Sequence, residues 1–171
     1  PVEAFRPGQV ERRGGSMKSQ AHEIMHKDLT AVTEKDRVED ALHVLYNQRL
    51  TGLPVVKDDW VLIGFLSETD ILQAAFPTYL EFLAQSSFLD SSEGSLVDRL
   101  ASVANRTVGE LMNAHPCYVE PTASLVTVAD MMIRKRIKRL PVVENGRLIG
   151  IIDRGAFFEH MMEKRTHDGN G

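Results

Sequence analysis

Cysteine is nearly absent from this 171-residue sequence, in which Cys117 is the single example. A lone cysteine excludes an intrachain disulfide framework and a zinc site built from several cysteines. Positive charge is not in excess either: 20 Lys and Arg stand against 24 Asp and Glu, for a net charge of −4 at pH 7. We therefore expect no nucleic-acid partner, because phosphate contacts need clustered positive charge.

Long hydrophobic runs are also missing. No apolar run approaches the roughly 20 residues that a membrane helix needs, so no membrane span is expected. The first twenty residues hold no apolar core of the kind found in a signal peptide, and a cytoplasmic location follows as the default. Hydrophobic residues still make up 43% of the chain, as is ordinary for a folded domain.

Sequence signatures of catalysis are missing as well. The chain has no Walker loop, no Gly-x-Gly-x-x-Gly and no Gly-x-Ser-x-Gly motif, and its six histidines do not follow a metal-ligand spacing. We therefore predict neither an enzyme nor a metal site, and no obligatory cofactor. Cys117 lacks an evident histidine partner and is interpreted as a small buried side chain rather than a nucleophile.

The sequence does contain an internal duplication. Residues 53–56 (Leu-Pro-Val-Val) recur at 140–143, an offset of 87 residues. Residues 62–66 (Leu-Ile-Gly-Phe-Leu) recur at 148–152 as Leu-Ile-Gly-Ile-Ile, an offset of 86. Landmarks repeated in the same order, with a slip of one residue in the intervening turn, indicate two copies of one structural unit.

Each copy predicts the same order of elements: an extended segment, an amphipathic helix, two short strands joined by a turn, and a last helix. The extended segments are 30–33 and 117–120, and the last helices begin near Glu68 and Arg154. Neither copy of about 60 residues buries much core alone, so we expect the copies to pack against each other. Apolar residues at helical spacing predict the first helix of each copy, namely Val38, Ala41, Leu42 and Leu45, and then Leu125, Val128, Ala129 and Met132.

The duplication divides the chain into five predicted segments. They are a flexible leader (1–19), a first repeat (20–74), a helical linker insertion (75–104), a second repeat (105–163) and a flexible tail (164–171). The linker is too long for a simple connection, so we expect helices in it. Its aromatic-rich start, with Phe76, Tyr79, Leu80, Phe82 and Leu83, would cover the edge of the repeats or contact a second chain.

The duplicated pattern resembles the CBS domain family, and in particular its tandem pair, the Bateman module. The resemblance rests on the two Leu-Pro-Val-Val strands and on the segment Gly64-x-x-Ser67-x-x-Asp70. It implies an α+β fold of two pseudo-symmetric β-α-β-β-α CBS repeats, packed sheet to sheet, with the helical linker insertion between them. It also implies clefts between the repeats for an adenine nucleotide (AMP, ADP, ATP) or related adenosyl ligand, a homodimer, and control of a partner protein that the sequence does not identify.

A nucleotide cleft needs an acid for the ribose and bases for the phosphate. A carboxylate such as Asp70 can accept hydrogen bonds from two adjacent ribose hydroxyls, and Ser67 can donate to a phosphate beside a helix start. The resemblance assigns the phosphate to Lys138 and Arg139. The predicted ligand-binding set is Ser67, Thr69, Asp70, Asn113, His115, Pro116, Cys117, Ile137, Lys138 and Arg139.

Simpler interpretations compete with these roles. Asp70 and Ser67 could only cap a helix, and a capping Ser67 could still serve a ligand. The basic run 134–139 could suggest nucleic acid, but without aromatic neighbours it favours a solvated helix face for Arg134 and Lys135. The role of Arg136 stays open. The whole module could also be a ligand-free dimerisation or interaction unit.

The second cleft departs from the family pattern. Asp153 stands where Ser or Thr is expected, and Ala156 stands where the ribose acid is expected. Thr51 and Gly52, at the positions that match Lys138 and Arg139, carry no charge. Because a carboxylate repels a phosphate, we predict one competent nucleotide site per chain.

Overall fold

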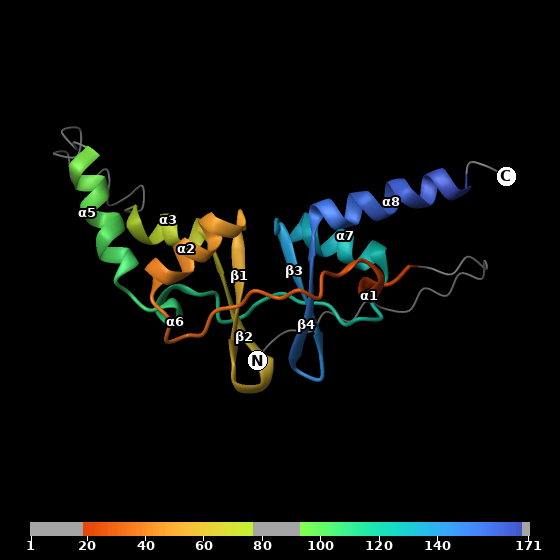
Figure 1. Cartoon of the computed structure of the whole chain (residues 1–171), viewed down its shortest axis with the longest axis horizontal. Helices are drawn as coiled ribbons and strands as arrows, with labels where there is room; N and C mark the ends of the chain where they lie inside the picture. Colours follow the sequence, from red (N-terminus) through yellow and green to blue (C-terminus); the bar gives the residue numbers. More distant parts are fainter. Residues whose placement is uncertain (1–18, 77–92, 169–171) are drawn as a thin grey trace. The chain divides into compact units, whose positions relative to one another are not determined.

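The computed structural model of the chain describes residues 19–76 and 93–168 (Figure 1). Most of the predicted leader, the aromatic start of the linker beyond Phe76, and the last three residues of the predicted tail lie outside the described residues. Within these two ranges, no helix combines the length and the hydropathy needed to cross a bilayer.

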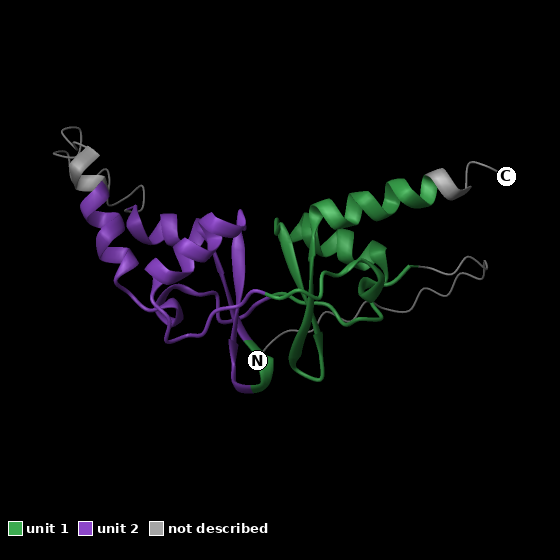
Figure 2. Ribbon diagram, in the orientation of Figure 1, with its two compact units in different colours: residues 1–29, 59–62, 117–171 green, residues 30–58, 63–116 purple. Residues whose placement is uncertain are grey.

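The chain forms two compact units (Figure 2). Unit 1 comprises residues 1–29, 59–62 and 117–171, and unit 2 comprises residues 30–58 and 63–116. Each unit is thus assembled from separate stretches of the sequence. Each is described below by itself.

Unit 2 places helices against a pair of neighbouring strands, as Figure 1 shows. The helix α2 buries Val38, Ala41 and Leu45, which belong to the predicted apolar stripe, and it ends where Arg49 adopts a left-handed conformation with φ 54°. The elements are α2 (Val38–Gln48), β1 (Gly52–Lys57), the 3₁₀ turn Asp58–Trp60, β2 (Val61–Ser67), α3 (Glu68–Ala75), α5 (Glu93–Ala104) and α6 (Val108–Leu111).

The strand β1 forms the centre of the unit 2 core. Leu53 and Val55 are buried on one face of it and Pro54 and Val56 on the other, which explains why residues 53–56 are apolar rather than alternating. Val32, from the predicted extended segment, forms a parallel bridge with Val55. The remaining buried core of this unit comprises Val38, Ala41, Leu45, Leu66, Ile71, Ala75, Val103 and Val108.

Unit 1 is built on the same plan. Its elements are α1 (Ala21–Ile24), α7 (Leu125–Arg134), β3 (Arg139–Glu144), β4 (Arg147–Asp153) and α8 (Arg154–Asp168). Strands β3 and β4 are antiparallel and joined through Asn145 and Gly146, whose φ angles of 51° and 80° fit the hairpin predicted from an Asn-Gly pair. Val119 bridges Val142 in parallel, as Val32 bridges Val55. The helix α8 includes residues 164–168 of the predicted tail.

The short helical turn that precedes each repeat packs in the unit of the other repeat. In unit 1, the Ala21 N–H donates to the Ala123 carbonyl at 2.8 Å. In unit 2, the Val108 N–H donates to the Asp36 carbonyl at 2.8 Å. These contacts are made by the main chain, so no pattern of side chains indicates them. The sequence therefore did not predict that each short helix packs in the unit of the other repeat.

Four residues of the β1–β2 turn region belong to unit 1. Val61 pairs antiparallel with Arg147, and the Leu62 N–H donates to the Gly146 carbonyl at 3.2 Å. Mixed helices and strands with antiparallel pairing confirm the predicted α+β class, whereas sheet-to-sheet packing of the repeats stays a prediction.

Candidate functional site

The ten predicted ligand-binding residues are divided between the two units. Ser67, Thr69, Asp70, Asn113, His115 and Pro116 belong to unit 2. Cys117, Ile137, Lys138 and Arg139 belong to unit 1.

Ser67 and Asp70 meet at the junction of β2 and α3. The Asp70 Oδ2 atom accepts hydrogen bonds from the Ser67 backbone N–H at 2.8 Å and from the Ser67 hydroxyl at 2.6 Å. In return, the Ser67 Oγ atom accepts from the Asp70 backbone N–H at 3.2 Å. This reciprocal arrangement is a capping box, so the capping role of both residues is present in the structure.

The Asp70 carboxylate keeps an oxygen that the cap does not use. Among the described residues, both donors to this carboxylate bind Oδ2, and none of the hydrogen bonds reaches Oδ1. Asp70 is half-buried, while Thr69 beside it is exposed on the first turn of α3. The arrangement can therefore present a fixed carboxylate oxygen next to a helix start.

The loop after α6 is held beside β2. Asn113 and Phe65 exchange backbone hydrogen bonds of 2.9 and 3.0 Å, and the Asn113 side chain accepts from the His115 N–H at 2.9 Å. Glycine at position 64 leaves room for this approach, because a Cβ atom there would lie 2.5 Å from the Met112 sulfur. Asn113 is therefore two strand positions from Ser67, with His115 exposed next to it.

The same arrangement recurs in unit 1 with different side chains. His26 exchanges backbone hydrogen bonds of 2.8 and 3.0 Å with Ile151, and Met25 packs over Gly150. The His26 Nε2 atom lies 3.3 Å from Asp153 Oδ2. Sequence reasoning missed this pair, although the 87-residue offset that matches His26 with Asn113 could have found it.

Arg139 faces Asp153 across the β3–β4 hairpin. The two residues are register partners, and the Arg139 Nε atom is the one buried side-chain nitrogen or oxygen without a hydrogen-bond partner in the part of the chain that the structure describes. Burial lowers the pKa of Arg139, and the nearby Asp153 carboxylate partly offsets this effect. A partly buried guanidinium with an unsatisfied N–H can bind an anionic group.

The neighbours of Arg139 differ in exposure. Lys138 is exposed, whereas Ile137 packs against the unit 1 core, so its side chain has a structural role. The Arg154 guanidinium donates to the Ile137 carbonyl at 3.3 Å, a contact that sequence reasoning did not predict. Cys117 packs against the same core but is half-buried, rather than buried as the sequence predicted.

The duplication matches Ser67 with Asp153, and it matches Lys138 and Arg139 with Thr51 and Gly52. These matching positions have structural roles. Asp153 Oδ1 accepts from the Ala156 N–H at 2.8 Å and so caps α8. The Thr51 carbonyl accepts from the Glu68 N–H at 3.1 Å. At Gly52, a Cβ atom would lie 2.5 Å from the Phe65 ring, so a longer side chain has no room there without movement.

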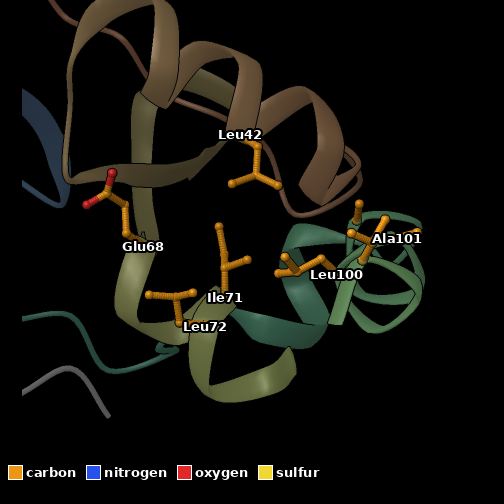
Figure 3. Close-up of a pocket in the computed structure, with 8 residues that line it drawn as sticks. Leu42, Glu68, Ile71, Leu72, Leu100 and Ala101 are labelled. Atoms are coloured by element: carbon orange, nitrogen blue, oxygen red, sulfur yellow. The ribbon is translucent and has the colours of Figure 1, made fainter. Parts of the chain in front are cut away.

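A separate groove of about 660 Å³ lies among α2, α3 and α5 in unit 2 (Figure 3). Leu42, Ile71 and Leu100 come from the three helices, and Glu68 stands at one end. The lining is almost wholly apolar and includes no basic side chain, so it does not suit a phosphate. Within the described ranges, no three His, Cys, Asp or Glu side chains are grouped closely enough to hold a metal ion.

Comparison with known proteins finds one family. The family model described as CBS domain matches residues 21–76 and again residues 108–163. The protein CBSX1 of Arabidopsis thaliana, named as a chloroplastic CBS domain-containing protein, is 32% identical over 162 residues, which cover 84% of this chain and 64% of CBSX1. Its counterpart CBSX2 is 31% identical over 141 residues, which cover 75% of this chain and 57% of CBSX2.

The chain thus spans less than two thirds of the length of these two relatives. Among solved structures, CBSX2 in complex with AMP superposes with a TM-score of 0.66 at 28% identity, covering 85% of this chain and 98% of that one.

Proposed function

This chain belongs to the CBS domain family, and we propose on that premise that it is a regulatory module that senses an adenine nucleotide or a related adenosyl ligand. The ligand would control a partner protein, and the role would be regulatory rather than catalytic. The observation that carries the proposal is the Ser67–Asp70 pair, which fixes a carboxylate at a helix start with one oxygen unused by the cap. The AMP complex of CBSX2 supports this choice of ligand class.

Each proposed contact follows from the chemistry of the side chain. Asp70 Oδ1 would accept hydrogen bonds from the ribose hydroxyls, and Ser67 and the exposed Thr69 would donate to the ligand. Lys138 and the unsatisfied Nε of Arg139 would bind the phosphate. Asn113, His115, Pro116, Cys117 and Ile137 complete the proposed set, the last through its backbone because its side chain packs in the core.

We propose one such site per chain. The site related to it by the duplication would need the positions of Asp153, Ala156 and Gly52. Asp153 is negative, Ala156 has no polar group, and Gly52 has the Phe65 ring over it. A phosphate there would meet a carboxylate and no cation from the Thr51–Gly52 pair.

The test is isothermal titration calorimetry with AMP, ATP and S-adenosylmethionine, together with thermal unfolding. A ligand at one hundred times its dissociation constant should stabilise the protein by about 2.7 kcal/mol. A double-mutant cycle with Asp70→Asn and Arg139→Met should show coupling in the free energy of binding if both residues bind the same nucleotide. The absence of binding by all three ligands at millimolar concentration would refute the proposal.

A ligand-free dimerisation or interaction module is the second candidate. It is favoured by large apolar side chains exposed on unit 1, among them Val126 at 79% and Ile133 at 74% exposure. We propose a homodimer in either case, and light scattering at about 50 µM should give twice the monomer mass, because obligate contacts persist at that concentration. A cytoplasmic location is also part of the proposal, and fractionation of the native cells would test it.

A further inference from the structure

We propose that Arg154, which no family motif identifies here, contacts the phosphates of the bound nucleotide and makes the site prefer a triphosphate over a monophosphate. This inference rests on the proposed nucleotide-binding function and adds the ligand class to it. It is argued from unit 1 alone, where Arg154 opens the helix α8.

Arg154 lies next to the loop that is proposed to bind phosphate. The Arg154 guanidinium donates to the Ile137 carbonyl at 3.3 Å, and Ile137 directly precedes Lys138 and Arg139. Asp153, the residue before Arg154, is the register partner of Arg139. The Arg154 charge therefore lies beside the two residues that are proposed to bind phosphate.

Within the described residues, no carboxylate neutralises the Arg154 charge. Two other arginines of unit 1 have carboxylate partners: Arg134 lies 2.7 Å from Asp130, and Arg147 lies 3.3 Å from Asp59. Arg154 has no carboxylate partner among the described residues. Its side chain is exposed, and the bond to a carbonyl uses one of five N–H donors.

Positive charge is in excess around the loop 136–139. Arg136, Lys138, Arg139 and Arg154 bring four positive charges. The carboxylate in register with Arg139 is Asp153, which already caps α8 and contacts His26. The buried Arg139 Nε still lacks an acceptor. One phosphate neutralises fewer of these charges than a chain of three, because each added phosphate adds negative charge.

The experiment compares AMP and ATP binding by isothermal titration calorimetry, without divalent cations. The proteins are the whole wild-type chain and its Arg154→Gln variant. The matched control is Arg165→Gln, which removes the same charge from an exposed position on the same helix, about 16 Å further along. We expect wild type to bind ATP more tightly than AMP. Arg154→Gln should weaken ATP binding about tenfold, as loss of one charge-assisted contact would, and AMP binding less than twofold.

Two results would overturn the inference while leaving nucleotide sensing intact. One is equal affinity of wild type for AMP and ATP. The other is an Arg154→Gln variant that binds AMP and ATP with equally reduced affinity, or with unchanged affinity, or with the same affinities as Arg165→Gln. Failure of the proposed function is distinct, since wild type would then bind neither nucleotide, and the inference would be refuted with it.

Discussion

Ser67 and Asp70 hydrogen-bond each other in both directions, with Asp70 Oδ2 accepting from the Ser67 N–H at 2.8 Å and Ser67 Oγ accepting from the Asp70 N–H at 3.2 Å. The capping interpretation and the ligand interpretation of Asp70 are therefore compatible, because the cap uses one carboxylate oxygen. It also follows that a substitution of Asp70 affects both the fold and the ligand, and the two effects have to be separated.

Asp70→Ala should lower the free energy of unfolding by about 1 kcal/mol, because the Ser67 N–H and hydroxyl lose their acceptor. Asp70→Asn should cost less, since an amide oxygen can still accept from Ser67. Urea unfolding of the ligand-free protein measures both. If both variants were as stable as wild type, the capping box would contribute nothing to the stability of α3.

Arg139→Met should leave the free energy of unfolding unchanged or raise it, while it weakens nucleotide binding. A methionine fills a similar space without a buried N–H that lacks an acceptor, and replacing such a group by an apolar one is often neutral or stabilising. Paired measurements of unfolding and of AMP affinity test this. A variant that is strongly destabilised would show that Arg139 serves the fold.

Gly150→Ala should destabilise unit 1 by about 1–3 kcal/mol through overpacking. A Cβ atom at position 150 would meet the Met25 side chain along its length, down to Met25 Cβ at 2.9 Å, and a Cβ atom cannot move unless the backbone moves. Gly64→Ala should cost less, because its nearest neighbour is the more adjustable Met112 sulfur. Urea unfolding measures which of the two variants loses more free energy of unfolding. Adding Met25→Ala to Gly150→Ala should restore part of the stability that Gly150→Ala loses. A reversed order would contradict the contacts described here.

Acid should weaken the cap of α6 through Glu110. The Thr107 backbone N–H, at 2.8 Å, and then the Thr107 hydroxyl lower the pKa of Glu110 below its ordinary value of 4.5. A carboxyl whose pKa is lower in the folded state stabilises the fold above the unfolded-state pKa, and this contribution is lost as the pH falls through the folded-state pKa.

Between pH 6 and about pH 3, Glu110→Gln should therefore lose less stability than wild type, because a glutamine keeps the capping-box acceptor without titrating. Urea unfolding across this range is the measurement, and Glu39→Gln on the same unit corrects for the removal of one carboxylate. A Glu110→Gln variant with the same pH dependence as wild type would be inconsistent with the lowered pKa.

The sequence predicted those parts of the fold that depend on local pattern. The repeated Leu-Pro-Val-Val strands, the Asn145–Gly146 turn and the apolar faces of α2 and α7 all follow from periodicity and turn chemistry. It did not predict that α1 packs in unit 1 and α6 in unit 2, because backbone hydrogen bonds such as Ala21 N–H to Ala123 carry no side-chain signal.

The candidate site was predictable to the same degree. The Ser67-x-x-Asp70 spacing identified a helix cap, which the structure contains. No local pattern marks the contact of Arg154 with Ile137, and the contact of His26 with Asp153 could have been found only through the offset of the duplication. The ligand roles of the ten predicted residues stay predictions, since they depend on a bound molecule.

The most direct test of the central claim is the calorimetric stoichiometry of AMP on wild type and on Asp70→Asn. The account predicts one AMP per chain for wild type, and markedly weaker AMP binding by the variant even though its α3 cap persists. Two equivalent sites per chain, or full binding by Asp70→Asn, would contradict it.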